Sequence, residues 1–164
     1  MKRFLKLLLI TILALFILIQ LYPRPKKNVE KNLNPYDISL TNKTPPGVHK
    51  ILKVSCYNCH SNNTIYPWYA SLQPVAWWLG DHITEGKKEL NFSEFGTYSL
   101  RRKYKKLDEI IKEVEEDKMP LQNYTRLHHD AKLDTSEKAA ILAWANTEYD
   151  KMTANYPADS LVKK

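Results

Sequence analysis

The two cysteines of this 164-residue chain lie three positions apart, and a histidine follows the second one directly, as Cys56-Tyr57-Asn58-Cys59-His60. Two thiols at this spacing can form thioether bonds to the two vinyl groups of one haem. The adjacent histidine is then held beneath the iron, where it can bind as an axial ligand. The C-x-x-C-H window therefore predicts that Cys56 and Cys59 attach a haem c and that His60 is its proximal ligand.

Other uses of the cysteine pair fit the sequence less well. A thioredoxin-type redox pair is expected in a βαβ setting, and residues 40–80 show none. A structural zinc site commonly needs four ligands, but there is no second cysteine pair, and His82, His128 and His129 are poorly spaced to complete the set. A disulfide between thiols this close would enclose a very small loop and stabilise little. Haem attachment is the preferred interpretation.

A second candidate iron ligand lies far downstream, where Met119 precedes Pro120 in a stretch without helical pattern. A thioether sulfur is a soft, neutral ligand, and Met/His ligation raises the reduction potential of a haem. The proline fixes the backbone and helps to aim the preceding side chain. We expect Met119 to be the sixth ligand. Two alternatives stay open: Met119 only fills the core, or His82 binds the iron in its place.

The elements that must position these residues are predicted to be helices, because glycine is scarce and no strand-like alternation persists. Apolar residues at three- and four-residue spacing predict about four helices, over residues 46–60, 72–90, 99–117 and from 134 onward. Asp134 and Glu137 match a capping box at the start of the last one. The second helix is expected to bury a face that carries Val75, Trp78, Leu79 and His82.

The N-terminus, residues 1–22, has the pattern of an export signal or a membrane anchor. Lys2, Arg3 and Lys6 precede sixteen uncharged residues, from Leu7 to Tyr22. No small-x-small cleavage site follows, so an uncleaved signal anchor is the preferred prediction and a cleaved signal peptide the alternative. The apolar stretch is at the short end of the ~17–25 residues that span a bilayer.

Residues 23–46 follow as a segment rich in proline, lysine and asparagine, which predicts an extended linker that lifts a domain off the membrane. The domain itself is expected over residues 47–152, with a C-terminal tail over residues 153–164. About 140 residues beyond the anchor suffice for one small domain.

The formal net charge is +7, and three of these positive charges lie in the first six residues. The remaining excess is modest, and no basic patch interleaved with aromatic residues indicates nucleic-acid binding. Arg101 and Arg102 could pair with the propionates of a haem, because guanidinium groups suit carboxylates. In the basic run over residues 101–106, a solvated helix face is an equally good interpretation.

Several segments together make residues 48–145 resemble the small bacterial haem-binding-domain family of single-haem, class I-like cytochromes c. The segments are Cys56-Tyr-Asn-Cys-His60-Ser-Asn-Asn-Thr64, Tyr66-Pro-Trp-Tyr69, Pro74-Val-Ala-Trp-Trp78, Asp81-His82, Leu90-Asn-Phe-Ser-Glu-Phe95 and Met119-Pro120. The resemblance implies a small all-α, cytochrome c-like domain with one covalent haem on Cys56 and Cys59 and with His60 as proximal ligand. It leaves the sixth ligand and the partner open.

Location and function follow from that resemblance. Positive charge flanks the apolar stretch on both sides, so charge alone does not orient it. Covalent c-type haem is assembled outside the bacterial cytoplasm, which predicts a domain anchored in the inner membrane and facing the periplasm, or free in the periplasm after cleavage. We expect a one-electron carrier that meets redox partner proteins and is not an enzyme. The alternative is a haem-based sensor or peroxidase-like enzyme with an open sixth site.

Overall fold

Helices make up the regular structure of the chain in the computed structural model, which describes residues 1–30, 32 and 34–162. Four helices beyond the N-terminus have ten or more residues: α3 (Pro46–Ser55), α5 (Val75–Glu89), α6 (Leu100–Glu115) and α8 (Thr135–Asn155). Short α-helices and 3-10 helices connect them, namely α2 (Ile38–Thr41), α4 (Tyr57–His60), η1 (Trp68–Ser71), η2 (Phe92–Thr97), α7 (Gln122–Thr125), η3 (His129–Ala131) and α9 (Ala158–Leu161). Over the described ranges there is no strand, only one isolated bridge between Val29 and Asn63, and the all-α prediction is confirmed.

Local signals in the sequence set where the long helices begin. Pro46 occupies the first turn of α3, where its missing N–H is no loss. Ser99 caps α6 by accepting the backbone N–H of Arg102. The predicted capping box of α8 is present: Asp134 Oδ1 accepts the Glu137 N–H at 2.8 Å, and Glu137 Oε2 accepts the Asp134 N–H at 3.0 Å.

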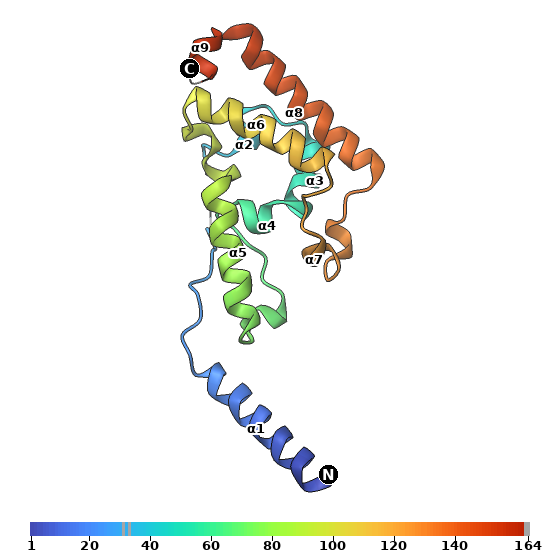
Figure 1. Cartoon of the computed structure of the whole chain (residues 1–164). Coiled ribbons are helices and arrows are strands. Elements are labelled where there is room, and N and C mark those ends of the chain that lie inside the picture. The colour runs from blue at the N-terminus through green and yellow to red at the C-terminus, as the bar shows by residue number, and fades with distance from the viewer. Residues whose placement is uncertain (31, 33, 163–164) are drawn as a thin grey trace.

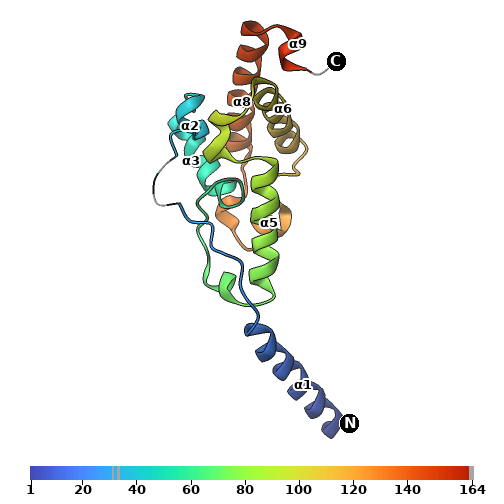
Figure 2. The ribbon, with the colours of Figure 1, turned by 90° about the vertical axis from the view of Figure 1, so that its left-hand side faces the viewer.

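The core lies where α6 and α8 pack side by side against α3 (Figures 1 and 2). The apolar stripes of these three helices face one another and exclude water from the contact. Their buried members are Val48 and Leu52 from α3, Leu107, Ile110 and Val114 from α6, and Ile141, Trp144, Ala145 and Met152 from α8. This layer is the rigid support on which the candidate ligands are held.

Two predictions about the helices were wrong in detail. The first helix does not run through to His60: it ends at Ser55, the backbone of Cys56 leaves the helical region, and α4 begins at Tyr57. Tyr57 is drawn into the core, where its hydroxyl donates to Asp37 Oδ1 at 2.9 Å and its ring stacks on Phe92.

The buried face of α5 was also assigned wrongly. Its buried residues are Ala76, Leu79 and Ile83, so Leu79 is the one shared member, while Trp78 is exposed. α5 has apolar side chains on two of its faces, and periodicity alone does not say which face meets the core.

The segment over residues 23–46, expected to be an extended linker, is not a free spacer, although its residues 31 and 33 lie outside the described residues. Its second half folds as part of the domain: Asp37 and Ile38 are completely buried, and the Tyr36 carbonyl accepts the Gly96 N–H at 2.7 Å. In its first half, the Asn28 amide donates to the Ser61 carbonyl at 2.7 Å and to Thr64 at 2.9 Å. The expected tail also continues the fold through α9, as far as residue 162, and residues 163–164 again lie outside the described part.

The N-terminal helix α1 (Lys2–Gln20) stands apart from the domain (Figure 1). It has 19 residues with a hydropathy of 2.2 and buries none of its side chains, so by length and composition it could cross a membrane. A signal sequence has the same properties.

Candidate functional site

The C-x-x-C-H motif lines two adjoining cavities between α4, α5, α6 and the loop before α7. Their volumes are about 340 Å³ and 440 Å³, in the range of ligand and cofactor sites. The residues that line both are Ser55, Cys56, His60, Glu89, Met119 and Pro120. The predicted proximal ligand and the predicted sixth ligand therefore border the same space, although they are far apart in the sequence.

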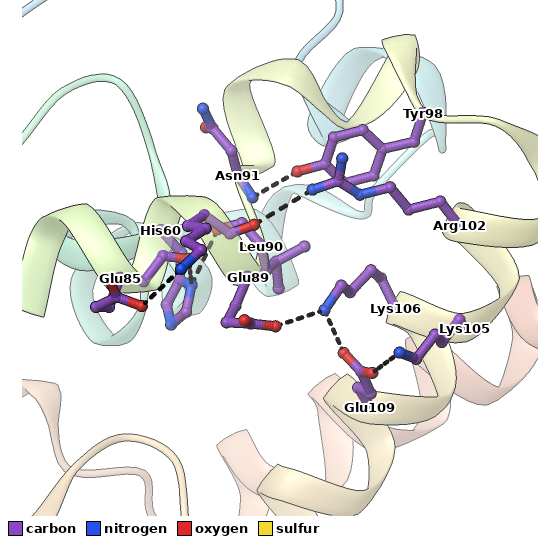
Figure 3. A network of polar contacts seen from close by, with 12 residues as sticks. His60, Glu85, Glu89, Leu90, Asn91, Tyr98, Arg102, Lys105, Lys106 and Glu109 are labelled. Atoms are coloured by element: carbon purple, nitrogen blue, oxygen red, sulfur yellow. Dashed lines mark hydrogen bonds and ion pairs between the residues drawn. The ribbon is translucent and has the colours of Figure 1, made fainter.

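The imidazole of His60 is fixed by α5. Its Nδ1 lies 2.9 Å from the carbonyl oxygen of Gly86 and 3.0 Å from that of Leu90, and only a protonated Nδ1 can donate to these acceptors (Figure 3). Nε2 then carries the free lone pair, which is the arrangement of a metal-binding histidine oriented by a backbone carbonyl. Burial is the main cause that lowers the pKa of His60, so the neutral ring that a metal requires is favoured.

Gly86 allows α5 to approach the motif closely. A Cβ at this position would lie 2.8 Å from the carbonyl oxygen of Cys59 and 3.3 Å from its Cβ. Because the glycine has no side chain, its own carbonyl reaches His60. The sequence prediction missed Gly86, although a glycine inside a helix costs about 1 kcal/mol relative to alanine and so indicates a packing reason.

Met119 reaches the cavities because α6 ends sharply. Asp117 adopts a left-handed conformation with φ 55°, and the Lys118 and Met119 N–H groups both donate to the carbonyl of Glu113. A left-handed residue just past a helix turns the chain back across the helix end. Met119 is consequently half-buried beside both cavities, which fits a thioether ligand opposite His60.

His82, the alternative to Met119 as sixth ligand, lies on α5. Among the described residues that line the cavities, His60 and His82 are the histidines, but His82 borders only the smaller cavity. Its Nδ1 is 2.8 Å from the carbonyl of Trp78, one turn earlier in α5, and its ring lies against the Trp78 ring. His128 instead hydrogen-bonds the Tyr69 hydroxyl through Nε2 at 2.6 Å. Met119 is therefore better placed than His82.

The thiols of Cys56 and Cys59 are free and partly buried. Burial, and secondarily the neighbouring Cys59, raises the pKa of Cys56 to about 12, and burial also raises the pKa of Cys59. A reactive redox pair needs lowered thiol pKa values, so the thioredoxin-type alternative is disfavoured. The zinc alternative gains no support either, since nowhere in the described chain do three His, Cys, Asp or Glu side chains gather as metal ligands.

A buried lysine in the wall of the larger cavity was missed by the sequence prediction. Lys106 belongs to the run interpreted as a solvated face, yet its side chain is only 7% exposed. Its Nζ lies 2.5 Å from Glu109 Oε2 and 3.2 Å from Glu89 Oε2 (Figure 3). Burial alone would lower the pKa of Lys106, but its hydrogen bonds and charge pairing with Glu109 and Glu89 raise it, so the ammonium stays charged.

The two arginines considered for the propionates are engaged elsewhere. Arg102 lies 3.9 Å above the ring of Tyr98 and donates to the Lys88 carbonyl, and Arg101 donates to the carbonyl of Asp159. Neither side chain lines the two cavities. The charged groups that do so from α6 are Lys106, Glu109 and Glu113.

A hydrogen bond between side chains joins the sixth-ligand loop to the attachment motif. Asn58, inside the C-x-x-C-H window, donates from Nδ2 to the Tyr124 hydroxyl at 2.7 Å, and its Oδ1 accepts the Ile65 N–H at 2.9 Å. Tyr124 lies in α7, five residues after Met119. This bond holds the loop that carries Met119 against α4, and nothing in the spacing of the sequence indicated it.

Comparison with known proteins gives one match. A family model described as a haem-binding domain matches residues 14–147, which include the C-x-x-C-H motif, α5, the cavity wall of α6 and Met119. No curated protein and no solved structure matches the chain. The residues fit a haem by their chemistry: two thiols, an oriented neutral imidazole and a thioether border one space whose walls are largely apolar.

Proposed function

Because the chain belongs to the haem-binding domain family, we propose that it holds one haem c covalently and serves as a membrane-tethered one-electron carrier. The observation that carries the proposal is the fixed imidazole of His60, with Nδ1 bound to two backbone carbonyls and Met119 on the wall of the same cavities. An imidazole and a thioether that face one space support six-coordinate iron, in which neither axial site is open to a substrate.

The thiols of Cys56 and Cys59 would make the attachment. Each S–H adds across one vinyl group, with sulfur bonded to one vinyl carbon and the hydrogen to the other, so no oxidant or reductant is consumed. His60, one residue beyond Cys59, would hold the haem iron through its free Nε2, while its carbonyl partners fix the ring.

When bound, the haem iron supplies a one-electron couple. The chain's contribution is to exclude water and tune the couple: Leu90, Phe92, Ile110 and Val114 present apolar surface to the larger cavity. Burial of the iron and a methionine ligand both favour a raised reduction potential.

The tether would be α1, with the domain on the outer side of the inner membrane, where covalent haem is assembled. Its 19 residues are long and apolar enough for an anchor, and since a signal sequence has the same properties, periplasmic release of a cleaved form is the alternative. The partners would then be redox proteins in or near the same membrane.

The test is a visible spectrum of the full chain, expressed with a haem-attachment system, beside the Cys56→Ser/Cys59→Ser double variant. We expect a sharp reduced α-band on haem that survives acid–acetone extraction in the unmodified chain and is extracted from the double variant. Haem that is extractable from both would contradict covalent attachment while leaving the haem-binding family intact.

One observation favours the second candidate, a sensor or peroxidase-like enzyme: His82 borders the smaller cavity together with Met119. If the methionine is displaced easily, an imidazole on that side could assist a small ligand. Carbon monoxide added to the reduced protein separates the two functions. Slow or no binding supports the carrier, and rapid binding supports the sensor or enzyme.

A further inference from the structure

Exposed apolar side chains gather at the end of the domain that lies nearest α1. The three residues Trp68, Leu72 and Trp78 are 79%, 37% and 42% exposed, and we call them the apolar patch. They come from the start of η1, from the residue that follows it and from the first turn of α5. In both views this part of the chain forms the lower end of the domain, beside the end of α1 (Figures 1 and 2).

The end of α1 is docked onto this part of the domain. The side chain of Gln20 and the backbone of Gln73 exchange two hydrogen bonds, of 3.0 Å and 2.9 Å. Tyr22 packs edge-on against Trp77, whose indole N–H donates to the carbonyl of Pro23. The apolar patch is thus continuous with the point at which the anchor leaves the bilayer.

We propose that the apolar patch lies in the headgroup region of the bilayer that α1 spans, so that the domain rests on the membrane. This rests on the proposed membrane tether. Tryptophan is the residue that favours the membrane–water interface, because its ring is apolar while its N–H needs a polar partner. Arg24, Lys26 and Lys27, exposed in the segment just after the anchor, add positive charge that attracts anionic lipid headgroups.

A lipid surface is favoured over a protein partner by this position. Any partner that covered the patch would have to occupy the space next to the emerging α1, which lipid headgroups already fill. Trp78, which the sequence placed on the buried face of α5, belongs to this exposed surface instead.

Helix α5 then sets the height of the haem site. It begins at the apolar patch, and Gly86, which binds His60, lies eleven residues after Val75. At 1.5 Å per residue this places the proximal ligand roughly 16 Å along the helix from the patch. The site would be held at a fixed distance from the membrane surface, within reach of redox partners embedded in the same bilayer.

The test uses the full chain in nanodiscs of mixed neutral and anionic phospholipid that carries a photoactivatable group near the headgroup. Cross-linked peptides are mapped by mass spectrometry, after the intact mass has shown that α1 is retained. We expect labelling of α1 and of the peptide over residues 64–78, and little labelling of α9 at the opposite end of the domain.

The matched variants are Trp68→Ser/Leu72→Ser in the patch and Val162→Ser at the far end. These side chains are exposed, so folding should be retained, which circular dichroism checks. Labelling of residues 64–78 should fall at least threefold in the first variant and stay unchanged in the second. If only α1 is labelled in the unmodified chain, the proposed contact between the apolar patch and the bilayer is wrong but the tether stands. If α1 is not labelled either, the proposed tether itself is wrong.

Discussion

At the scale of single residues, the site depends on one imidazole whose orientation comes from backbone rather than from a side chain. Because both acceptors, the carbonyls of Gly86 and Leu90, belong to the backbone, no side-chain substitution removes them directly. The position of His60 is therefore tied to the position of α5. Two residues are candidates for the sixth iron ligand: Met119, which borders both cavities, and His82, which borders one.

Replacement of Met119 with alanine should remove the sixth ligand. The reduction potential should fall by on the order of 100 mV, because a thioether stabilises the reduced iron, and the methionine–iron charge-transfer band of the oxidised form should vanish. Redox titration and visible spectroscopy measure both. The matched variant His82→Ala should leave the potential and the band unchanged; the reverse pattern would make His82 the ligand.

The buried charge of Lys106 should also act on the iron. Lys106→Met removes a positive charge from the wall of the larger cavity. The reduction potential should fall by tens of millivolts, because less positive charge then opposes the oxidation of the iron. Unfolding free energy should also fall, by up to about 3 kcal/mol, because the substitution removes one partner of the ion pair and leaves the partly exposed Glu109 and Glu89 without it. Lys105→Met, at a side chain that is 71% exposed, serves as the control and should shift the potential much less.

At the scale of elements, α5 is the part on which the site depends most. It supplies both acceptors for His60, packs against Cys59 and reaches down to the end of α1. A disturbance at its contact with α4 should therefore reach the haem without touching a ligand.

Gly86→Ala tests this contact. The new methyl group would meet the Cys59 carbonyl at 2.8 Å, so α5 must shift away from α4 and the hydrogen bonds of His60 must lengthen. We expect a loss of about 1–3 kcal/mol of unfolding free energy and a lower yield of six-coordinate haem, measured by urea unfolding and by the visible spectrum. Gly47→Ala, inside α3 and with nothing within 4 Å of the added atom, should leave the spectrum unchanged and raise the unfolding free energy by up to about 1 kcal/mol. Equal effects of the two substitutions would refute the packing argument.

The predictions from sequence succeeded where the signal is local. The starts of α3, α6 and α8 and the capping box at Asp134 follow from neighbours in the chain. They failed where a distant element decides: Cys56 leaves the helix beside Tyr57, which Asp37 holds in the core, and Lys106 is buried because Glu89 comes from α5. Within the candidate site, the sequence pattern identified the C-x-x-C-H motif and Met119. It did not identify Gly86, the Leu90 carbonyl or Tyr124, because these join the site only through tertiary contacts.

At the scale of the whole molecule, the domain begins earlier than the pattern of the sequence indicated. Ile38 and Asp37 are completely buried, and the hydroxyl of Tyr57, in α4, donates a hydrogen bond to Asp37. The residues just before α3 therefore belong to the structure that supports the haem site, and Asn28 ties the preceding segment to the loop after His60.

Two truncations test where the domain begins. Each is fused behind a cleavable export signal, and the chain that starts at residue 34 should fold and take up haem, whereas the one that starts at residue 47 should not. The second loses the burial of Ile38, worth about 1.5–3 kcal/mol, and leaves Tyr57 without its partner, which costs a further 1–3 kcal/mol or so. These losses are large beside the typical 5–15 kcal/mol of total stability. Circular dichroism and the visible spectrum decide; a folded chain from residue 47 would restore the linker prediction.

The contact between His60 and α5 has an electronic consequence as well as a geometric one. The Gly86 carbonyl lies in the last turn of α5 and the Leu90 carbonyl at its C-cap, so His60 meets the helix end at which aligned peptide dipoles leave a partial negative charge. An imidazole that donates its proton toward this negative pole is more electron-rich at its other nitrogen, and in the proposed site it would favour the oxidised iron. With Met119 as the proposed sixth ligand, the helix end and the thioether would act on the couple in opposite directions, and the position of α5 against α4 would adjust the balance between them.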